Sequence, residues 1–149
     1  MPQIVYSLQF RGQVALGSIS PKTLKETTTA LSCRLTTIVG PDGLSGALEP
    51  IDGEDALLES EVVPTGETSF SESGTITFGE GGHAIRFSTV SDGYLAPSSN
   101  PAIRHGCAIW KIAGGEGQFA HATGLITSNF TVGESGDVVD HQCGVIFLE

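Results

Sequence analysis

The chain has 149 residues, 39% of them hydrophobic, and a formal net charge of -10. This length suits a single domain over residues 1–149, and the hydrophobic fraction is enough for a core and excludes a disordered chain. Only seven Lys and Arg are present. We therefore expect no nucleic-acid partner and no binding to an anionic membrane, because both need clustered basic side chains.

The cysteines and the first residues indicate the compartment. Three cysteines are present, Cys33, Cys107 and Cys143, which is an odd number. The first residues show neither the basic segment nor the apolar core of a secretory signal. No apolar run approaches the ~20 residues that span a bilayer. We therefore expect reduced thiols in a cytoplasmic protein.

Twenty glycines and many short alternating runs are typical of β-structure with frequent turns. Residues 22–39 fit either a helix or a strand, and the threonine run favours a strand from Ala30 onward. Residues 56–63 fit a strand or a short helix. About eight strands are predicted among the runs at 3–10, 14–19, 30–39, 56–63, 67–78, 83–90, 103–112, 118–132 and 137–148.

Turns and loops separate these runs. We expect turns at residues 11–13 and 40–43, the second because Pro41 presets φ and Gly43 accepts a left-handed conformation. Residues 44–55 are acidic and predict a loop, and residues 91–101 predict the longest turn-rich loop. Short strands at this spacing predict an antiparallel barrel or sandwich, and closure into a barrel removes exposed edges.

A glycine-rich stretch precedes the two last predicted strands. The run from Gly114 to Gly117 predicts a tight turn. Phe119 would then close one end of the barrel, and Ala122 and Gly124 would let a neighbouring strand approach closely.

This stretch resembles the signature Gly-Gly-(Ser/Thr)-Gly-x-Phe-x-x-Ala-x-Gly of plant allene oxide cyclases, dirigent proteins and their bacterial relatives. Its fixed positions match Gly114, Gly115, Gly117, Phe119, Ala122 and Gly124, whereas Glu116 stands where Ser or Thr is usual. The resemblance implies an all-β, eight-stranded antiparallel closed barrel of calycin-like, allene oxide cyclase-like form, often trimeric, with an apolar interior for a small organic molecule. The chain looks like a bacterial relative outside both plant families. The matched residues are structural, so the resemblance assigns no catalytic residue.

Two His-x-Cys pairs place histidine and cysteine on one face of a strand, at His105 with Cys107 and at His141 with Cys143. In facing registers they would form a Cys₂His₂ zinc site. Buried cysteines that act as small hydrophobes beside ordinary histidines are the simpler interpretation, and we expect no metal and no cofactor. Cys107 could also form a nucleophilic pair with His105 or His141. Asp140 more simply faces solvent or ends a turn.

Other side chains are candidates if they face the lumen. Arg86 would bind a carboxylate or enolate oxygen from inside, and would be a surface residue from outside. Asn129 fits either a ligand carbonyl or hydroxyl or a satisfied structural role. Tyr94 fits a lid, an acid or a packing cap, and Trp110 fits the core or the cavity wall.

The function that we predict is a cofactor-independent isomerase or cyclase that acts on a small hydrophobic metabolite in a homo-oligomer, a dimer or trimer. The catalytic candidates are Arg86, His105, Asn129 and His141, and the ligand-binding candidates are Tyr94, Cys107, Trp110 and Phe87. A non-catalytic binder, a dirigent-type scaffold and a filled structural barrel are the alternatives. A pair of facing carboxylates, as in glycosidases, is disfavoured because the acids concentrate at residues 49–61 and 134–137.

Overall fold

Strand pairing organises nearly all of the described chain. The computed structural model describes residues 2–16 and 22–149, so the predicted strand at 14–19 extends beyond the described residues. The strands are β1 (Gln3–Leu16), β2 (Leu24–Ala30), β3 (Cys33–Gly40), β4 (Gly43–Pro50), β5 (Ala56–Pro64), β6 (Ser69–Phe78), β7 (Ala84–Thr89), β8 (Gly93–Pro97), β9 (Ile103–Glu116), β10 (Thr123–Gly133) and β11 (Asp137–Phe147). A 3₁₀ turn, η1 (Gly117–Phe119), is the single helical element among the described residues.

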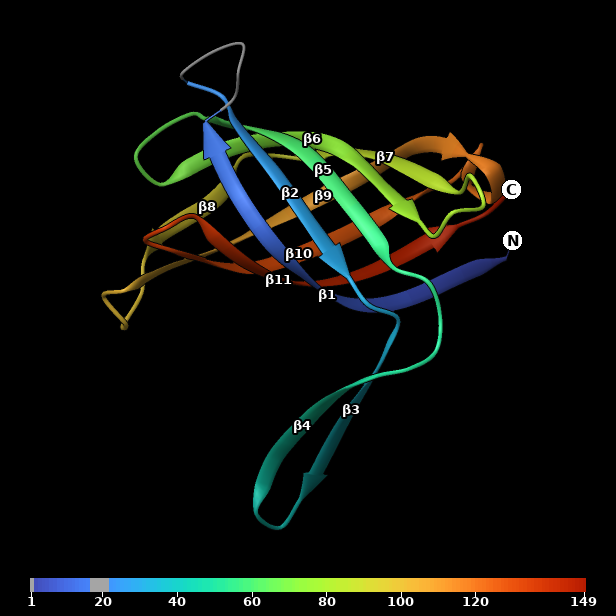
Figure 1. The fold of residues 1–149 in the computed structure, drawn as a ribbon, viewed down its shortest axis with the longest axis horizontal. Helices are drawn as coiled ribbons and strands as arrows, with labels where there is room; N and C mark the ends of the chain where they lie inside the picture. The colour runs from blue at the N-terminus through green and yellow to red at the C-terminus, as the bar shows by residue number, and fades with distance from the viewer. Residues whose placement is uncertain (1, 17–21) are drawn as a thin grey trace.

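The main sheet closes on itself. Its strands follow the order β10-β11-β1-β2-β5-β6-β7-β9, and β9 pairs in turn with β10. Strand β8 pairs with β6 and β9 beyond the end of β7, so β7 and β8 share one position in the wall. The result is the predicted closed eight-stranded antiparallel barrel (Figure 1).

Strand β1 is continuous, so the turn predicted at residues 11–13 is wrong. It pairs with β11 from Gln3 to Gln13 and with β2 from Arg11 to Leu16. A β-carbon on Gly12 would lie 2.1 Å from the carbonyl oxygen of Thr27. This glycine therefore permits a close approach of β2 rather than a turn.

Strands β3 and β4 form a hairpin that projects from the barrel, which we call the arm (Figure 1). Its tip is the predicted turn at residues 40–43. The loop predicted at residues 44–55 is wrong in its first part, because Gly43–Pro50 pairs with β3 along its whole length. Part of the loop predicted at 91–101 is likewise strand β8.

The glycine-rich stretch turns later than predicted. Strand β9 continues to Glu116, and the chain then turns through η1. Phe119 is 3% exposed and packs on Phe78 with 5.4 Å between ring centroids. It closes the barrel end as predicted, because the positive φ of Gly117 (63°) permits the turn that directs it inward.

Alternation along the strands separates the interior from the outer surface. The apolar core fills the part of the barrel nearest Phe119 and includes Phe10, Leu58, Ile76, Ile85, Trp110, Ile126 and Ile146. Buried polar side chains occupy interior positions farther along the strands, at Thr28, Ser60, Glu72, Ser128, Asp140 and Gln142. The interior is thus divided into an apolar part and a polar part.

Candidate functional site

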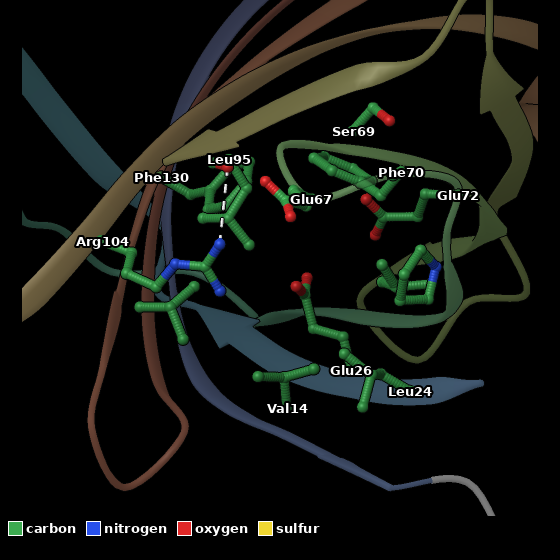
Figure 2. Close-up of a pocket in the computed structure, with 14 residues that line it drawn as sticks. Val14, Leu24, Glu26, Glu67, Ser69, Phe70, Glu72, Leu95, Arg104 and Phe130 are labelled. Atoms are coloured by element: carbon green, nitrogen blue, oxygen red, sulfur yellow. Dashed lines mark hydrogen bonds between the residues drawn. The ribbon is translucent and has the colours of Figure 1, made fainter. Parts of the chain in front are cut away.

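A cavity of about 190 Å³ lies at the end of the barrel opposite Phe119. Its walls are mainly apolar and are formed by Val14, Leu24, Val62, Phe70, Leu95, Phe130 and Val132. The lining also includes three acidic side chains and one basic side chain: Glu26, Glu67, Glu72 and Arg104. Figure 2 shows the Glu26 and Glu72 carboxyl groups directed into this space.

Strand register brings the two inner carboxyl groups toward each other. Glu26 on β2 pairs with Ser60 on β5, and Glu72 on β6 pairs with the neighbouring interior residue Val62. The Ser60 hydroxyl donates a hydrogen bond to Glu72 Oε2 at 2.6 Å. The backbone N–H of Glu72 donates to Thr89 Oγ1 at 3.2 Å, which helps to hold this part of β6 in place.

Burial favours the protonated forms of both carboxyl groups. It raises the pKa of Glu26 to about 9, with further contributions from the nearby charges of Glu72 and Asp140. It raises the pKa of Glu72 to about 7, while the hydrogen bond from Ser60 opposes the shift. Near neutral pH the pair therefore holds a proton, and the hydrogen bond from Ser60 favours the ionised form of Glu72.

A buried hydrogen-bond network adjoins the cavity. Asp140 accepts hydrogen bonds from the Ser128 hydroxyl at 2.7 Å and from the Gln142 amide at 2.8 Å. Tyr6 completes the network by donating its hydroxyl to Gln142 Oε1 at 3.3 Å. Burial raises the pKa of Asp140 to about 6 against these hydrogen bonds. The expectation that Asp140 faces solvent is wrong, because the even-numbered face of β11 is the interior one and leaves Asp140 2% exposed.

Five of the predicted site residues lie together, but on the outer surface of the barrel. The register aligns Tyr94, Cys107, Asn129 and His141 across four adjacent strands, and His105 lies two residues from Cys107. Together they line a shallow depression that is open to solvent. The His141 and Gln9 side chains contact each other through their Nε2 atoms at 3.3 Å. The structure therefore brings these residues together without placing them in the lumen.

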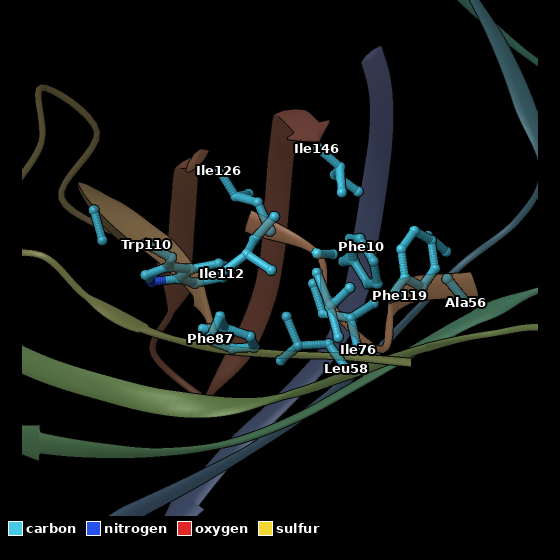
Figure 3. Packing of buried hydrophobic residues seen from close by; sticks show 14 of the residues in the cluster. Phe10, Ala56, Leu58, Ile76, Phe87, Trp110, Ile112, Phe119, Ile126 and Ile146 are labelled. Carbon is cyan, nitrogen blue, oxygen red and sulfur yellow. The ribbon is translucent and has the colours of Figure 1, made fainter. Parts of the chain in front are cut away.

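The remaining predicted residues lie elsewhere. Arg86 is exposed on the outside of β7. Trp110 and Phe87 are stacked in the apolar core, with ring centroids 4.1 Å apart, and neither lines the cavity (Figure 3).

The arrangement expected for a zinc site is also not formed. Strand β10 lies between β9 and β11, so the two His-x-Cys pairs do not face each other. Within residues 2–16 and 22–149 no group of three or more His, Cys, Asp or Glu side chains could hold a metal ion.

The sequence-based candidates omit Glu26, Glu72 and Arg104. For Glu72 a signal was present: it lies on the same face of an alternating run as Phe70, Ile76 and Phe78. A carboxylate on an apolar strand face indicates a buried acid. The expectation that acids concentrate in loops did not take this pattern into account.

Comparisons with known proteins add no family. No protein-family model matches the chain, and no curated protein or solved structure is significantly similar to it. Among the described residues, no helix is both long and apolar enough to cross a membrane. The resemblance to the allene oxide cyclase and dirigent group therefore stays a prediction.

Proposed function

We propose that this barrel binds a small hydrophobic metabolite at its open end and acts there as a cofactor-independent isomerase or cyclase, with Glu26 as acid and Glu72 as base. The observation that carries the proposal is the pair of carboxyl groups in an apolar cavity, Glu72 buried and Glu26 half-buried. Both pKa values are raised, so near neutral pH the pair holds a proton that one carboxyl can donate while the other accepts one.

The chemistry that fits this pair is a proton shift next to a carbonyl group. The Glu72 carboxylate removes a proton from the carbon beside the carbonyl, while the Glu26 carboxyl donates its proton to the carbonyl oxygen. An enol forms, and the protons return with the double bond in its new position. Substrate and product are isomers, so the step needs no oxidant, reductant or cofactor. The apolar walls would hold the substrate in a reactive conformation and exclude water.

The cavity limits the size of the ligand. Its volume of about 190 Å³ is below the ~300 Å³ at which pockets for drug-sized ligands begin. The ligand must therefore be small, such as a monocyclic ketone. Arg104 at the rim donates a hydrogen bond to the Leu95 carbonyl at 3.5 Å and adds a positive charge near the entrance.

The test uses cyclohex-3-en-1-one, a small β,γ-unsaturated ketone whose conversion to the conjugated isomer is followed by ultraviolet absorbance. The wild-type protein should accelerate the conversion with saturation kinetics. Glu72→Gln, which keeps the side-chain shape and removes the base, should lower kcat by about 10²–10⁴-fold. Glu26→Gln should also lower kcat, because an amide is a far poorer proton donor.

The matched control is Glu67→Gln, which changes an exposed carboxylate at the rim of the same cavity. It should leave kcat within about twofold, since general acid–base catalysis acts through the two inner groups. Acceleration that survives both inner substitutions would exclude the assigned roles. Saturable binding of the ketone without conversion would instead support the non-catalytic ligand-binding alternative.

A further inference from the structure

The arm has two different faces. Strand alternation and register place four large apolar side chains on one face: Leu35, Val39, Leu44 and Leu48. The opposite face carries the Arg34–Glu49 ion pair at 3.9 Å. Val39 is 81% exposed and Leu44 is 74% exposed. A two-stranded hairpin with an uncovered apolar face is marginally stable alone in water, which indicates that something packs against that face.

The apolar face of the arm is turned toward one side of the barrel. Leu35 and Leu48, near the base of the arm, line a groove with Ser7, Asn129 and Cys143 on the outer surface of β1, β10 and β11. The arm and this surface therefore form the two sides of an angle (Figure 1). The more distal residues Val39 and Leu44 extend past the contact at the base.

The barrel side of this angle, which we call the wall, carries exposed apolar side chains and is free of acidic ones. Its outward residues on four adjacent strands include the apolar Val5, Leu125, Ile109 and Val145, beside polar residues such as Lys111 and Gln9. Leu125 is 53% exposed. The register aligns outward residues of β11, β10 and β9 with Val5, Ser7 and Gln9 of β1. None of these described residues is Asp or Glu.

Charge indicates which partner fits this angle. The chain carries a net charge of -10, so two copies repel each other over most of their surfaces. The wall and the apolar face of the arm carry no acidic side chain, so this repulsion is weak where they meet. One chain also supplies both halves of a contact, the apolar face of the arm and the wall, which is what a twofold dimer requires.

We propose that two copies of this chain form a twofold dimer in which the apolar face of each arm packs on the wall of the other copy. With eight residues in each strand, the arm is about 26 Å long and about 10 Å wide from standard strand spacings. Two arm-to-wall contacts of that footprint bury on the order of 1,000 Å² in total, which is the lower limit for a biological interface and is typical of a weak dimer.

The test is sedimentation equilibrium of the full chain and of four single variants. The wild-type protein should be a dimer. Val39→Glu places a charge on the apolar face of the arm, and Leu125→Glu places one on the wall. Because each change occurs twice in a twofold dimer, each should raise the dimer dissociation constant by more than about tenfold.

Each variant has a control of the same chemistry. Ile38→Glu adds the same charge to the adjacent, opposite face of the arm, and Val63→Glu adds it to an exposed site on β5. Both should leave the dimer intact. A monomeric or trimeric wild-type protein would overturn the proposal. So would an Ile38→Glu variant that weakens association as much as Val39→Glu does.

Hydrogen exchange of the unmodified chain gives a second measurement that needs no variant. Amides of β3 and β4 should exchange more slowly as protein concentration rises, because dimerisation covers the arm. Exchange in the arm that does not depend on concentration would contradict the dimer, even if the glutamate variants failed to fold.

Discussion

The raised pKa of Glu26 predicts that the protein loses stability as the pH rises. Its carboxyl has an ordinary pKa of 4.5 and one of about 9 in the fold. The stabilising contribution is thus present in full below the ordinary value and is lost as the pH approaches 9. From about pH 5 to pH 7 the unfolded chain has released a proton that the folded protein keeps on Glu26, so this group alone lowers the free energy of unfolding by ~1.4 kcal/mol per pH unit. The raised pKa values of Glu72 and Asp140 add to the slope in the same direction.

Over two pH units, one retained proton corresponds to a loss on the order of 3 kcal/mol. For a chain of this size that is roughly 6–12 °C in Tm. Thermal unfolding followed by circular dichroism, at a series of pH values and constant ionic strength, measures the slope directly. Glu26→Gln should match the wild-type Tm near pH 5, exceed it at neutral pH and show a shallower slope.

The control is Glu67→Gln, which removes an exposed carboxylate at the rim and should keep the wild-type slope. Comparison with this variant separates the effect of Glu26 on the Tm slope from the general charge repulsion within an acidic chain. A wild-type Tm that is constant or rises between about pH 5 and pH 7 would contradict a raised pKa of Glu26 in the fold, as would an unchanged slope in Glu26→Gln.

Two further predictions concern the barrel itself. Phe119→Ala should lower the free energy of unfolding in urea by about 3–5 kcal/mol, because it empties the closed end of the barrel. A loss below about 1 kcal/mol would contradict the role of Phe119 in closing that end. Gly12→Ala should lower Tm by several degrees more than Gly46→Ala, because its β-carbon would lie 2.1 Å from the Thr27 carbonyl oxygen, whereas at Gly46 the nearest atom is 3.7 Å away. Equal Tm values for the two variants would show that β1 and β2 can separate at little cost.

Local patterns such as the alternation of Asp137–Phe147 were enough to predict antiparallel strands in a barrel or sandwich, because alternation acts over short distances. The closed eight-stranded barrel was predicted from the resemblance of the glycine-rich stretch around Phe119. Local patterns were insufficient where pairing between strands determines whether a segment is a turn, a loop or a strand. Gly12 is compatible with a turn until β2 is known to pass over it, and Gly43–Pro50 becomes a strand because β3 pairs with it.

The site was harder to predict for the same reason. His105, Asn129 and His141 were chosen for their chemistry, yet alternation alone cannot say which strand face is the lumen. Pairing places these three residues outside. Glu26 and Glu72 lie on interior faces of strands that share β5 as a neighbour, so their proximity depends on register and not on sequence distance.

The most direct test of a proton-holding pair in the barrel mouth is a ¹³C NMR titration of the glutamate side-chain carboxyl carbons, with Glu26→Gln and Glu72→Gln used to assign the signals. One signal, lost in Glu26→Gln, should titrate near pH 9, far above the ordinary value of 4.5. A Glu26 signal that titrates near 4.5 would mean that the carboxyl is ionised at neutral pH, and neither the acid role of Glu26 nor the predicted loss of stability would hold.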